Sequence, residues 1–177
     1  MTPPIKEILI SRAELQQRVA ALAEEIDRAY AGEELVLISV LKGSIVFLSD
    51  LMKELHLDVE IGFLYLSSYR GKTSPQGGVQ EYLLPFPEIA GRHALLVEDI
   101  LDTGASLAYA WDRCLAKHPR SLKTCVLLVK EGAEKEGVPK ADFRGFDIPN
   151  VFVVGYGLDY KEKYRQLPCI AVPDMGK

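Results

Sequence analysis

The sequence predicts an α/β fold, in which a mostly parallel β-sheet is flanked by helices. A short apolar run, Leu35–Val40, is typical of a strand that is buried on both faces, and Leu122–Val129, which ends in five apolar residues from Cys125, is predicted as another buried strand. After the first run, apolar residues recur at helical spacing from Ile45 to Leu55, and the same change of period follows a third run, Ala94–Val97. Strands that alternate with helices in this way favour a parallel sheet covered by its crossover helices.

The composition fits one globular domain over residues 1–177, because 48% of the residues are hydrophobic. A net charge of −4 gives no bulk attraction to nucleic acid or to an anionic membrane, so we expect a small-molecule partner. No apolar run approaches the roughly 20 residues of a membrane span, and the first ten residues do not resemble a secretory signal. We therefore expect a cytoplasmic protein. The three cysteines and three histidines are scattered, which predicts buried thiols and no histidine-based metal site.

The first half of the chain is predicted to begin with a helix and to continue as strand, helix, strand. Ser11 and Glu14 form a capping box, and apolar residues then keep helical phase as far as Gly32. After the strand Leu35–Val40 and the helix that follows it, apolar residues alternate from Val59 to about Ser67, which indicates another strand.

A hairpin with a mobile tip is predicted next. Residues 69–78 are polar and contain three glycines and a proline, so they offer too little apolar surface to order themselves. Residues 79–84 are predicted to return as a strand, which leaves the tip of the hairpin available to close over a ligand.

The C-terminal part is predicted to hold three strands. They are Leu122–Val129, Val151–Gly155 and Cys169–Val172. The segment Asp159–Arg165 is too short and too polar for a core helix.

Three carboxylates mark the loop after the run Ala94–Val97. Glu98 and Asp99 follow the run directly, and Asp102 opens a turn that leads through Gly104 into the next helix. The free N–H groups at the start of a helix suit a phosphate, since the aligned peptide dipoles amount to roughly half a positive charge there. The neighbouring acids suit hydroxyl groups, a divalent metal or a proton.

The carboxyl ends of parallel strands meet at one edge of a sheet, and ligands bind there. In this sequence the predicted ends carry Lys42 and Gly43, the loop from Glu98 to Gly104, Lys130, and residues 155–159. Lysines, glycines and carboxylates at one edge fit a phosphorylated sugar with a metal ion.

These motifs resemble those of the purine phosphoribosyltransferases, most closely the hypoxanthine–guanine type. Glu98–Ser106 is similar to the family's phosphoribosyl-pyrophosphate loop, Leu41–Ser44 to its pyrophosphate loop, and Ser68-Tyr69 to a pair on its flexible closing loop. Residues 142–160 look like its purine-binding end. The resemblance implies the type I phosphoribosyltransferase fold with a small hood and a flexible hairpin loop, and a homodimer or homotetramer.

The resemblance also implies a reaction and a catalytic group. The family uses Mg²⁺ to transfer 5-phosphoribosyl from phosphoribosyl pyrophosphate to a 6-oxopurine, here hypoxanthine and/or guanine, giving IMP or GMP and pyrophosphate. By resemblance, Asp102 is the catalytic general base or acid on the N7 side of the purine, a role worth typically ~10²- to 10⁴-fold in rate.

Each substrate group is likewise matched to residues by the resemblance. Glu98 and Asp99 bind the ribose hydroxyls and, with Asp159, the magnesium. The 5′-phosphate is held by Asp102, Thr103, Gly104, Ala105 and Ser106, although many relatives carry a cation where this chain has Ala105. Pyrophosphate is bound by Lys42, Gly43 and Arg165, the purine by Lys130, Phe152, Val153 and Asp159, and Ser68 and Tyr69 close over the reacting centre.

Simpler interpretations and rival functions remain open from the sequence. Taken singly, Glu98 and Asp99 fit a solvated turn, Asp102 fits a helix N-cap, Lys42 fits a solvated strand end, and Phe152 fits a core strand. A nucleic-acid-binding regulator that senses the same ligands on the same fold is one rival, which the acidic balance and Asp102 disfavour. Transfer to adenine or orotate is the other, which Lys130 disfavours, and the order of preference among hypoxanthine, guanine and xanthine is left open.

Overall fold

The computed structural model describes residues 4–68, 79–82 and 86–176. The predicted mobile loop 69–78 lies outside these residues. In chain order the elements are β1 (Ile5–Ile10), α1 (Arg12–Ala29), β2 (Leu35–Leu41), α2 (Ile45–Glu54), β3 (Val59–Ser68), β4 (Val79–Tyr82), β5 (His93–Leu101), α3 (Ala105–Leu115), β6 (Ser121–Lys130), β7 (Phe143–Ile148) and β8 (Ile170–Pro173).

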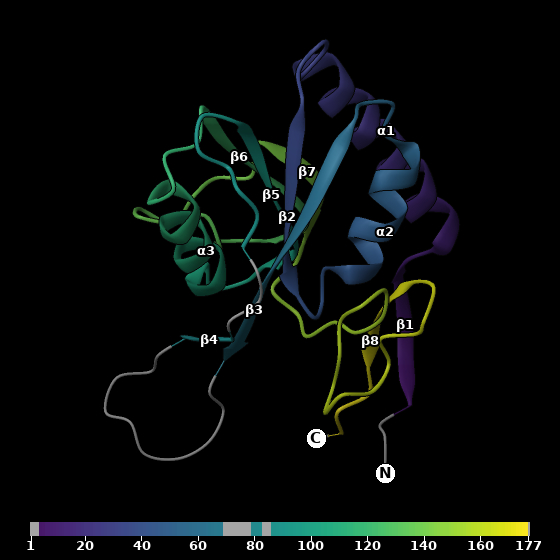
Figure 1. The fold of residues 1–177 in the computed structure, drawn as a ribbon. Helices are drawn as coiled ribbons and strands as arrows, with labels where there is room; N and C mark the ends of the chain where they lie inside the picture. Colours follow the sequence, from purple (N-terminus) through teal and green to yellow (C-terminus); the bar gives the residue numbers. More distant parts are fainter. Residues whose placement is uncertain (1–3, 69–78, 83–85, 177) are drawn as a thin grey trace.

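A six-stranded sheet in the order β4-β3-β2-β5-β6-β7 forms the centre of the molecule. The pairs from β3 to β7 are parallel, and only β4 runs antiparallel, against β3. Helices α1 and α2 cover one face of the sheet and α3 covers the other (Figure 1). The predicted α/β class is confirmed, and the strand predicted at residues 79–84 is present as β4.

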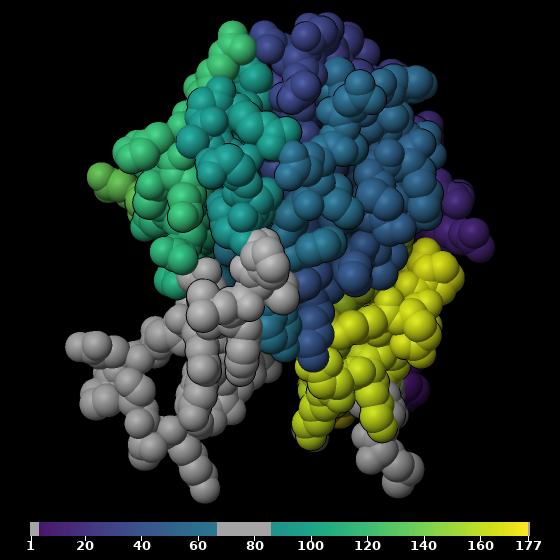
Figure 2. All heavy atoms as spheres, in the orientation of Figure 1, coloured from purple at the N-terminus to yellow at the C-terminus, as the bar shows by residue number. Residues whose placement is uncertain are grey.

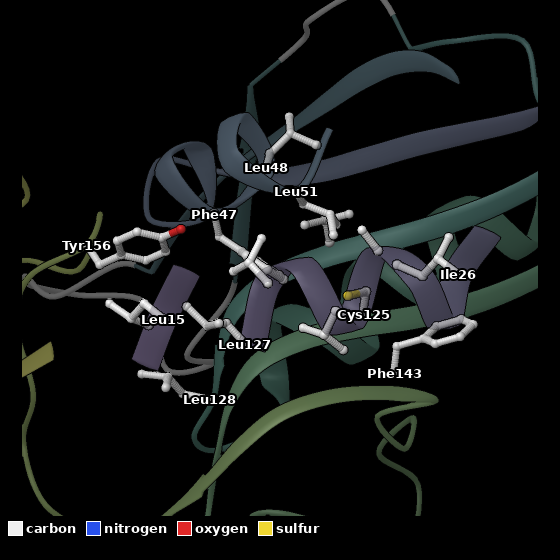
Figure 3. Close-up of a cluster of buried hydrophobic side chains, with 14 of the residues drawn as sticks. Leu15, Ile26, Phe47, Leu48, Leu51, Cys125, Leu127, Leu128, Phe143 and Tyr156 are labelled. Carbon is white, nitrogen blue, oxygen red and sulfur yellow. The ribbon is translucent and has the colours of Figure 1, made fainter. Parts of the chain in front are cut away.

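Neighbouring residues of each buried strand belong to different cores, because successive side chains point to opposite faces of a sheet. In β2, Leu35 and Leu37 pack with α1 and α2, whereas Val36 and Ile38 pack in the core on the α3 side. Figure 3 shows the first core, in which Phe47 and Leu51 of α2 meet Leu15 and Ile26 of α1 above Cys125 and Leu127 of β6. Both faces of the sheet are therefore apolar, as the continuous hydrophobic runs predicted.

Helix α1 begins at the predicted capping box. The Ser11 Oγ accepts a hydrogen bond from the Glu14 backbone N–H at 3.3 Å, and the Glu14 carboxylate accepts one from the Ser11 N–H at 2.8 Å. This reciprocal pair satisfies two N–H groups that would otherwise have no partner in the helix. The predicted apolar stripe, which includes Leu15, Val19 and Leu22, is the buried side of the helix.

A small second sheet lies beside the end of the main sheet where β2 turns into α2 (Figure 1). It pairs β1 antiparallel with β8, and this region corresponds to the hood. Figure 2 shows the C-terminal segment as a yellow lobe against the blue α2 region. Tyr156 fastens the two parts together, because its hydroxyl donates a hydrogen bond of 2.8 Å to the Asp50 carboxylate on α2.

Four details differ from the sequence-based expectations. The strand expected to stop at Val97 continues to Leu101, so it includes the first two carboxylates of the acidic loop. Residues 151–155 form no strand: Val154 makes a single antiparallel bridge to Ala171, and Gly155 makes one to Leu158. Strands β1 and β7 were not expected at all.

Candidate functional site

The carboxyl ends of β2, β5 and β6 lie next to one another, because these strands are parallel neighbours in the order β2-β5-β6. A cavity of about 400 Å³ opens at this edge. Its wall is formed mainly by residues 98–104 together with Ser106 and Leu107, closed by Val40, Leu41 and Leu66 from the neighbouring strands. The acidic loop is therefore the main wall of a cavity, as the parallel arrangement predicted.

Glu98 and Asp99 are buried acids within β5. Their residues are only 5% and 8% exposed. Burial, followed by repulsion from Asp99, raises the pKa of Glu98 well above its usual value, and the Glu98 Oε2 has no hydrogen-bond partner in the described part of the chain. Burial is also the largest cause that raises the pKa of Asp99 to about 6, opposed by the hydrogen bond from the Ile100 N–H at 3.0 Å and by the charge of Arg165. The interpretation of these two acids as a solvated turn is therefore wrong, because burial is the largest cause that disfavours the charged form of both carboxyl groups.

The loop after β2 packs directly on Asp99. A Cβ atom on Gly43 would lie 1.8 Å from the Asp99 Oδ2, and a Cβ atom on Gly157 would lie 2.0 Å from the Gly43 carbonyl oxygen. The peptide bond between Leu41 and Lys42 is cis. A side chain at Gly157 would meet backbone, and one at Gly43 would displace the Asp99 carboxylate. The loop 42–44, the acidic loop and the segment near Gly157 therefore form one tightly packed edge.

Asp102 is paired with Lys130 rather than with the start of α3. The two side chains form an ion pair of 2.9 Å, in which Lys130 is buried and Asp102 is half exposed. The N-cap of α3 is Gly104 with φ +83°, so the N-cap interpretation of Asp102 is wrong. At this helix start the Ala105 N–H donates a long hydrogen bond of 3.4 Å to the Thr103 Oγ1. The N–H groups of the first turn have no carbonyl partner within the helix, and they lie beside the cavity that Thr103, Gly104 and Ser106 line.

Comparison with known proteins identifies the family to which this site belongs. A model of the phosphoribosyl transferase domain matches residues 5–161. The chain belongs to the phosphoribosyltransferase family. It is 42% identical over 176 residues to the hypoxanthine-guanine phosphoribosyltransferase of Mycobacterium avium, covering 96% of this chain and 86% of that protein. It is 39% identical over 172 residues to the Bacillus subtilis protein of the same name, covering 97% and 95% of the two chains.

Solved structures agree with the predicted type I phosphoribosyltransferase fold. A hypoxanthine-guanine phosphoribosyltransferase from Bacillus anthracis superposes with a TM-score of 0.87 at 42% identity, covering 96% of this chain and 97% of that one. The hypoxanthine phosphoribosyltransferase of Trypanosoma cruzi, solved in complex with the product IMP, gives 0.85 at 40% identity, covering 96% and 94%.

In this phosphoribosyltransferase, three of the four residues predicted to bind the base, Phe152, Val153 and Asp159, follow β7, whereas Lys130 ends β6. Phe152 is 38% exposed, and its ring is nearly perpendicular to that of Tyr160, at 6.0 Å between the ring centroids. Val153 is buried. Phe152 is therefore not a core strand residue, and its partly open ring is free to contact a planar ligand.

Asp159 has both carboxylate oxygens engaged. Its Oδ1 lies 2.9 Å from the Arg165 Nη2, and its Oδ2 accepts a hydrogen bond of 2.9 Å from the Glu162 N–H. The charge of Asp159 reaches Asp99 and raises that group's pKa. Nevertheless, within residues 4–68, 79–82 and 86–176, no three histidine, cysteine or acidic side chains gather as a metal-binding group.

The two predicted pyrophosphate cations converge on an acid that the sequence did not single out. The Glu162 Oε2 lies 3.2 Å from the Lys42 Nζ and 3.2 Å from the Arg165 Nη2. Hydrogen bonds from Arg165 and Lys42 lower the pKa of Glu162, and the same contact raises the pKa of Lys42. The sequence feature that could have identified Glu162 is its position three residues before Arg165, a predicted phosphate-binding residue.

The closing-loop pair lies at the limit of the described chain. Ser68 is the last residue of β3, and Tyr69 lies outside the described residues.

No helix among the described residues is long and apolar enough to cross a membrane.

Proposed function

We propose that this phosphoribosyltransferase acts in purine salvage, transferring the 5-phosphoribosyl group of phosphoribosyl pyrophosphate to hypoxanthine and guanine with Mg²⁺ and giving IMP or GMP and pyrophosphate. The observation that carries the proposal is the pair of Lys130 and Asp102, 2.9 Å apart beside the cavity. The activity in the names of the relatives from Mycobacterium avium and Bacillus subtilis supports the same substrates.

The Lys130 ammonium group selects a base with an acceptor at the 6-position. An ammonium group only donates hydrogen bonds, as does the 6-amino group of adenine, whereas hypoxanthine and guanine carry a 6-oxo acceptor. Since Lys130 is buried at the end of β6, an unmatched donor facing it would lose hydrogen bonds to water without replacement. Phe152 offers its ring to the base, and Val153 and Asp159 complete this end of the site with backbone contacts.

Asp102 acts as the general base or acid that transfers a proton at the purine N7 while the glycosidic bond forms. Its carboxylate is half exposed, so it reaches the cavity while Lys130 holds one of its oxygens. The general base or acid must lie within hydrogen-bonding reach of the proton that it transfers. Residues 102–106 bind the 5′-phosphate, mainly through backbone N–H groups at the start of α3, where the N-cap is Gly104, and this contact does not need a cation in place of Ala105.

The buried acids fit a magnesium ion that arrives with its substrate. Mg²⁺ is usually held by one or two carboxylates together with substrate phosphates, so two acids suffice. Glu98 and Asp99 would hold the ion and the ribose hydroxyls, with Asp159 as a further ligand, and the observation that fits is that the Glu98 Oε2 has no hydrogen-bond partner among the described residues. When bound, the ion would neutralise charge on the leaving pyrophosphate, and Lys42, Gly43 and Arg165 would bind that group.

Assay of purified protein with phosphoribosyl pyrophosphate, MgCl₂ and one base at a time tests the proposal. The bases are hypoxanthine, guanine, xanthine, adenine and orotate, and chromatography measures the nucleotide formed. We expect IMP and GMP, and we expect Lys130→Gln to lose most of its kcat/KM for hypoxanthine while its discrimination against adenine shrinks. If nucleotide forms only with adenine or orotate, the assignment of the base is refuted. If no nucleotide forms with any base, a ligand-sensing regulator is favoured.

The remaining parts of the proposal concern assembly and the closing loop. We infer a single domain over residues 1–177 that assembles as a homodimer or homotetramer, and closure of Ser68 and Tyr69 over the bound substrates. Size-exclusion chromatography with light scattering measures the assembly directly.

A further inference from the structure

Glu162 occupies the place between the two cations assigned to pyrophosphate. One carboxylate oxygen, Oε2, lies 3.2 Å from both the Lys42 Nζ and the Arg165 Nη2. These two residues are 123 positions apart in the chain, yet a single acid bridges them. A carboxylate oxygen shared by an ammonium and a guanidinium group makes the same kind of contact that a pyrophosphate oxygen would make.

The backbone around Glu162 holds this carboxylate in place. The Glu162 N–H donates to the Asp159 Oδ2 at 2.9 Å, and Tyr160 and Lys163 exchange two backbone hydrogen bonds of 3.1 Å. Within this turn, Lys161, Glu162 and Tyr164 have φ angles of +53°, +62° and +76°. Non-glycine residues rarely adopt this left-handed region, and clusters of them occur where surrounding contacts over-determine the backbone, often at functional sites.

Arg165 is aimed by a separate contact. Its Nη1 donates to the Gly157 carbonyl at 2.7 Å, and Gly157 packs on the Gly43 carbonyl so closely that a Cβ atom would not fit. Its Nη2, which contacts Glu162, also lies 2.9 Å from the Asp159 Oδ1, and this pair remains when Glu162 is replaced. The guanidinium group is thereby fixed beside the loop that carries Lys42. Loss of Glu162 would leave this arrangement of Arg165 in place, so the carboxylate is not needed to position the arginine.

We propose that Glu162 is an internal competitor for the pyrophosphate site, a carboxylate that occupies Lys42 and Arg165 in the free protein and is displaced when phosphoribosyl pyrophosphate binds. The proposal rests on the function proposed above. A pyrophosphate-bearing ligand must displace Glu162 from the two cations before it can bind them. This displacement reduces the net binding free energy of the ligand and makes its dissociation faster.

The size of the effect follows from the exposure of the groups. The side chains of Glu162 and Lys42 are 66% and 48% exposed, whereas that of Arg165 is 25% exposed. Ion pairs this open to solvent are weak, so removal of both contacts is expected to tighten binding by about 3- to 10-fold. Without the competing acid, the KM for phosphoribosyl pyrophosphate falls and kcat does not rise.

Calorimetric titration in MgCl₂ of the wild-type protein and Glu162→Gln with two probes tests the proposal. The probes are phosphoribosyl pyrophosphate and ribose 5-phosphate, which share the 5′-phosphate and differ in the pyrophosphate. We expect Glu162→Gln to bind phosphoribosyl pyrophosphate about 3- to 10-fold more tightly and to bind ribose 5-phosphate as the wild type does. Glu162→Ala leaves neither a carboxylate nor the amide that the Gln variant carries, and it is expected to give the same pattern.

The matched control is Glu24→Gln. Glu24 is 71% exposed in its ion pair with Arg28 on α1, so this variant loses the same charge and a similar surface pair away from the cavity. We expect it to bind both probes like the wild type. Equal or weaker binding of phosphoribosyl pyrophosphate by Glu162→Gln, or the same gain in Glu24→Gln, overturns the role of Glu162 and leaves the proposed function standing. Failure of the wild-type protein to bind phosphoribosyl pyrophosphate at all overturns the proposed function, and the role of Glu162 with it.

Discussion

Replacing Asp99 by asparagine should stabilise the ligand-free protein at neutral and alkaline pH. Asp99 is 8% exposed, and burial is the main cause that raises its pKa from 3.8 to about 6. The difference of about two pH units corresponds to roughly 3 kcal/mol of free energy that the charged carboxylate costs the folded state. An asparagine side chain keeps an oxygen that can accept the hydrogen bond from the Ile100 N–H and carries no charge.

The free energy of unfolding changes with pH because the folded and unfolded states bind different numbers of protons at Asp99. Between the usual aspartate pKa and a pKa of about 6, the folded protein binds more protons at Asp99 than the unfolded chain does. The free energy of unfolding of the wild type therefore falls as the pH rises through this range. The difference between Asp99→Asn and the wild type is close to zero below about pH 4 and reaches its full size above about pH 6. Glu98 retains its raised pKa through burial and contributes a residual slope in both proteins.

Urea denaturation in EDTA, at about pH 8 and about pH 4, measures this difference. We expect Asp99→Asn to gain up to about 3 kcal/mol at the higher pH, or up to about 6–12 °C in Tm, while its transferase activity falls. Asp112→Asn, an exposed change on α3, is the control and should alter neither quantity. If Asp99→Asn is equal to or less stable than the wild type at the higher pH, the carboxylate is not a destabilising charge and our account of the site is wrong.

Three further substitutions probe the same edge of the sheet. Asp102→Asn should lower kcat by about 10²- to 10⁴-fold with nucleotide binding largely intact, as measured by steady-state kinetics and IMP titration, and nearly full turnover would remove its catalytic role. Gly43→Ala should cost about 1–3 kcal/mol of stability in thermal unfolding, because its Cβ would lie 1.8 Å from the Asp99 Oδ2, and an unchanged Tm would contradict this packing. Gly104→Ala should also destabilise, since its φ is +83° and its Cβ would lie 2.5 Å from Val138, and adding Val138→Ala should restore part of the loss but not the part due to φ.

The main sheet was predictable because burial on both faces leaves a clear mark in the sequence. Leu35–Val40 is apolar except for Ser39, Leu122–Val129 is apolar from Cys125 onward, and both segments lie inside the main sheet, in β2 and β6. Their order along the chain, with helices between them, made the strands parallel and brought Lys42, the acidic loop and Lys130 to one edge. The location of the cavity could therefore be predicted from topology alone.

The hood was poorly predicted because its structure depends on contacts between distant parts of the chain. Strand β1 is mostly exposed and pairs with β8, more than 150 positions away, so no local pattern distinguishes it. Residues 151–155 are apolar enough for a strand, but the chain turns at Gly155 with φ +97°, where a Cβ atom would lie 2.1 Å from the Cys169 carbonyl oxygen. Close backbone packing replaces a regular ladder there. The contacts of Glu162 depend on the next turn, which the backbone hydrogen bonds between Tyr160 and Lys163 close, and they too could not be predicted.

The acidic loop shows most clearly why sequence pattern and structure diverge at this site. Two consecutive acids after an apolar run indicate the end of a buried strand, yet β5 carries Glu98 and Asp99 inside the sheet edge and continues to Leu101. Buried carboxyl groups with raised pKa values and an unpaired oxygen destabilise the free protein, and such groups are found mainly at functional sites. A cation or hydroxyl groups arriving with the substrate would relieve this cost in the bound state only. Under the proposed function, the burial that weakens the free fold would also be a source of binding free energy for a magnesium-bound sugar phosphate.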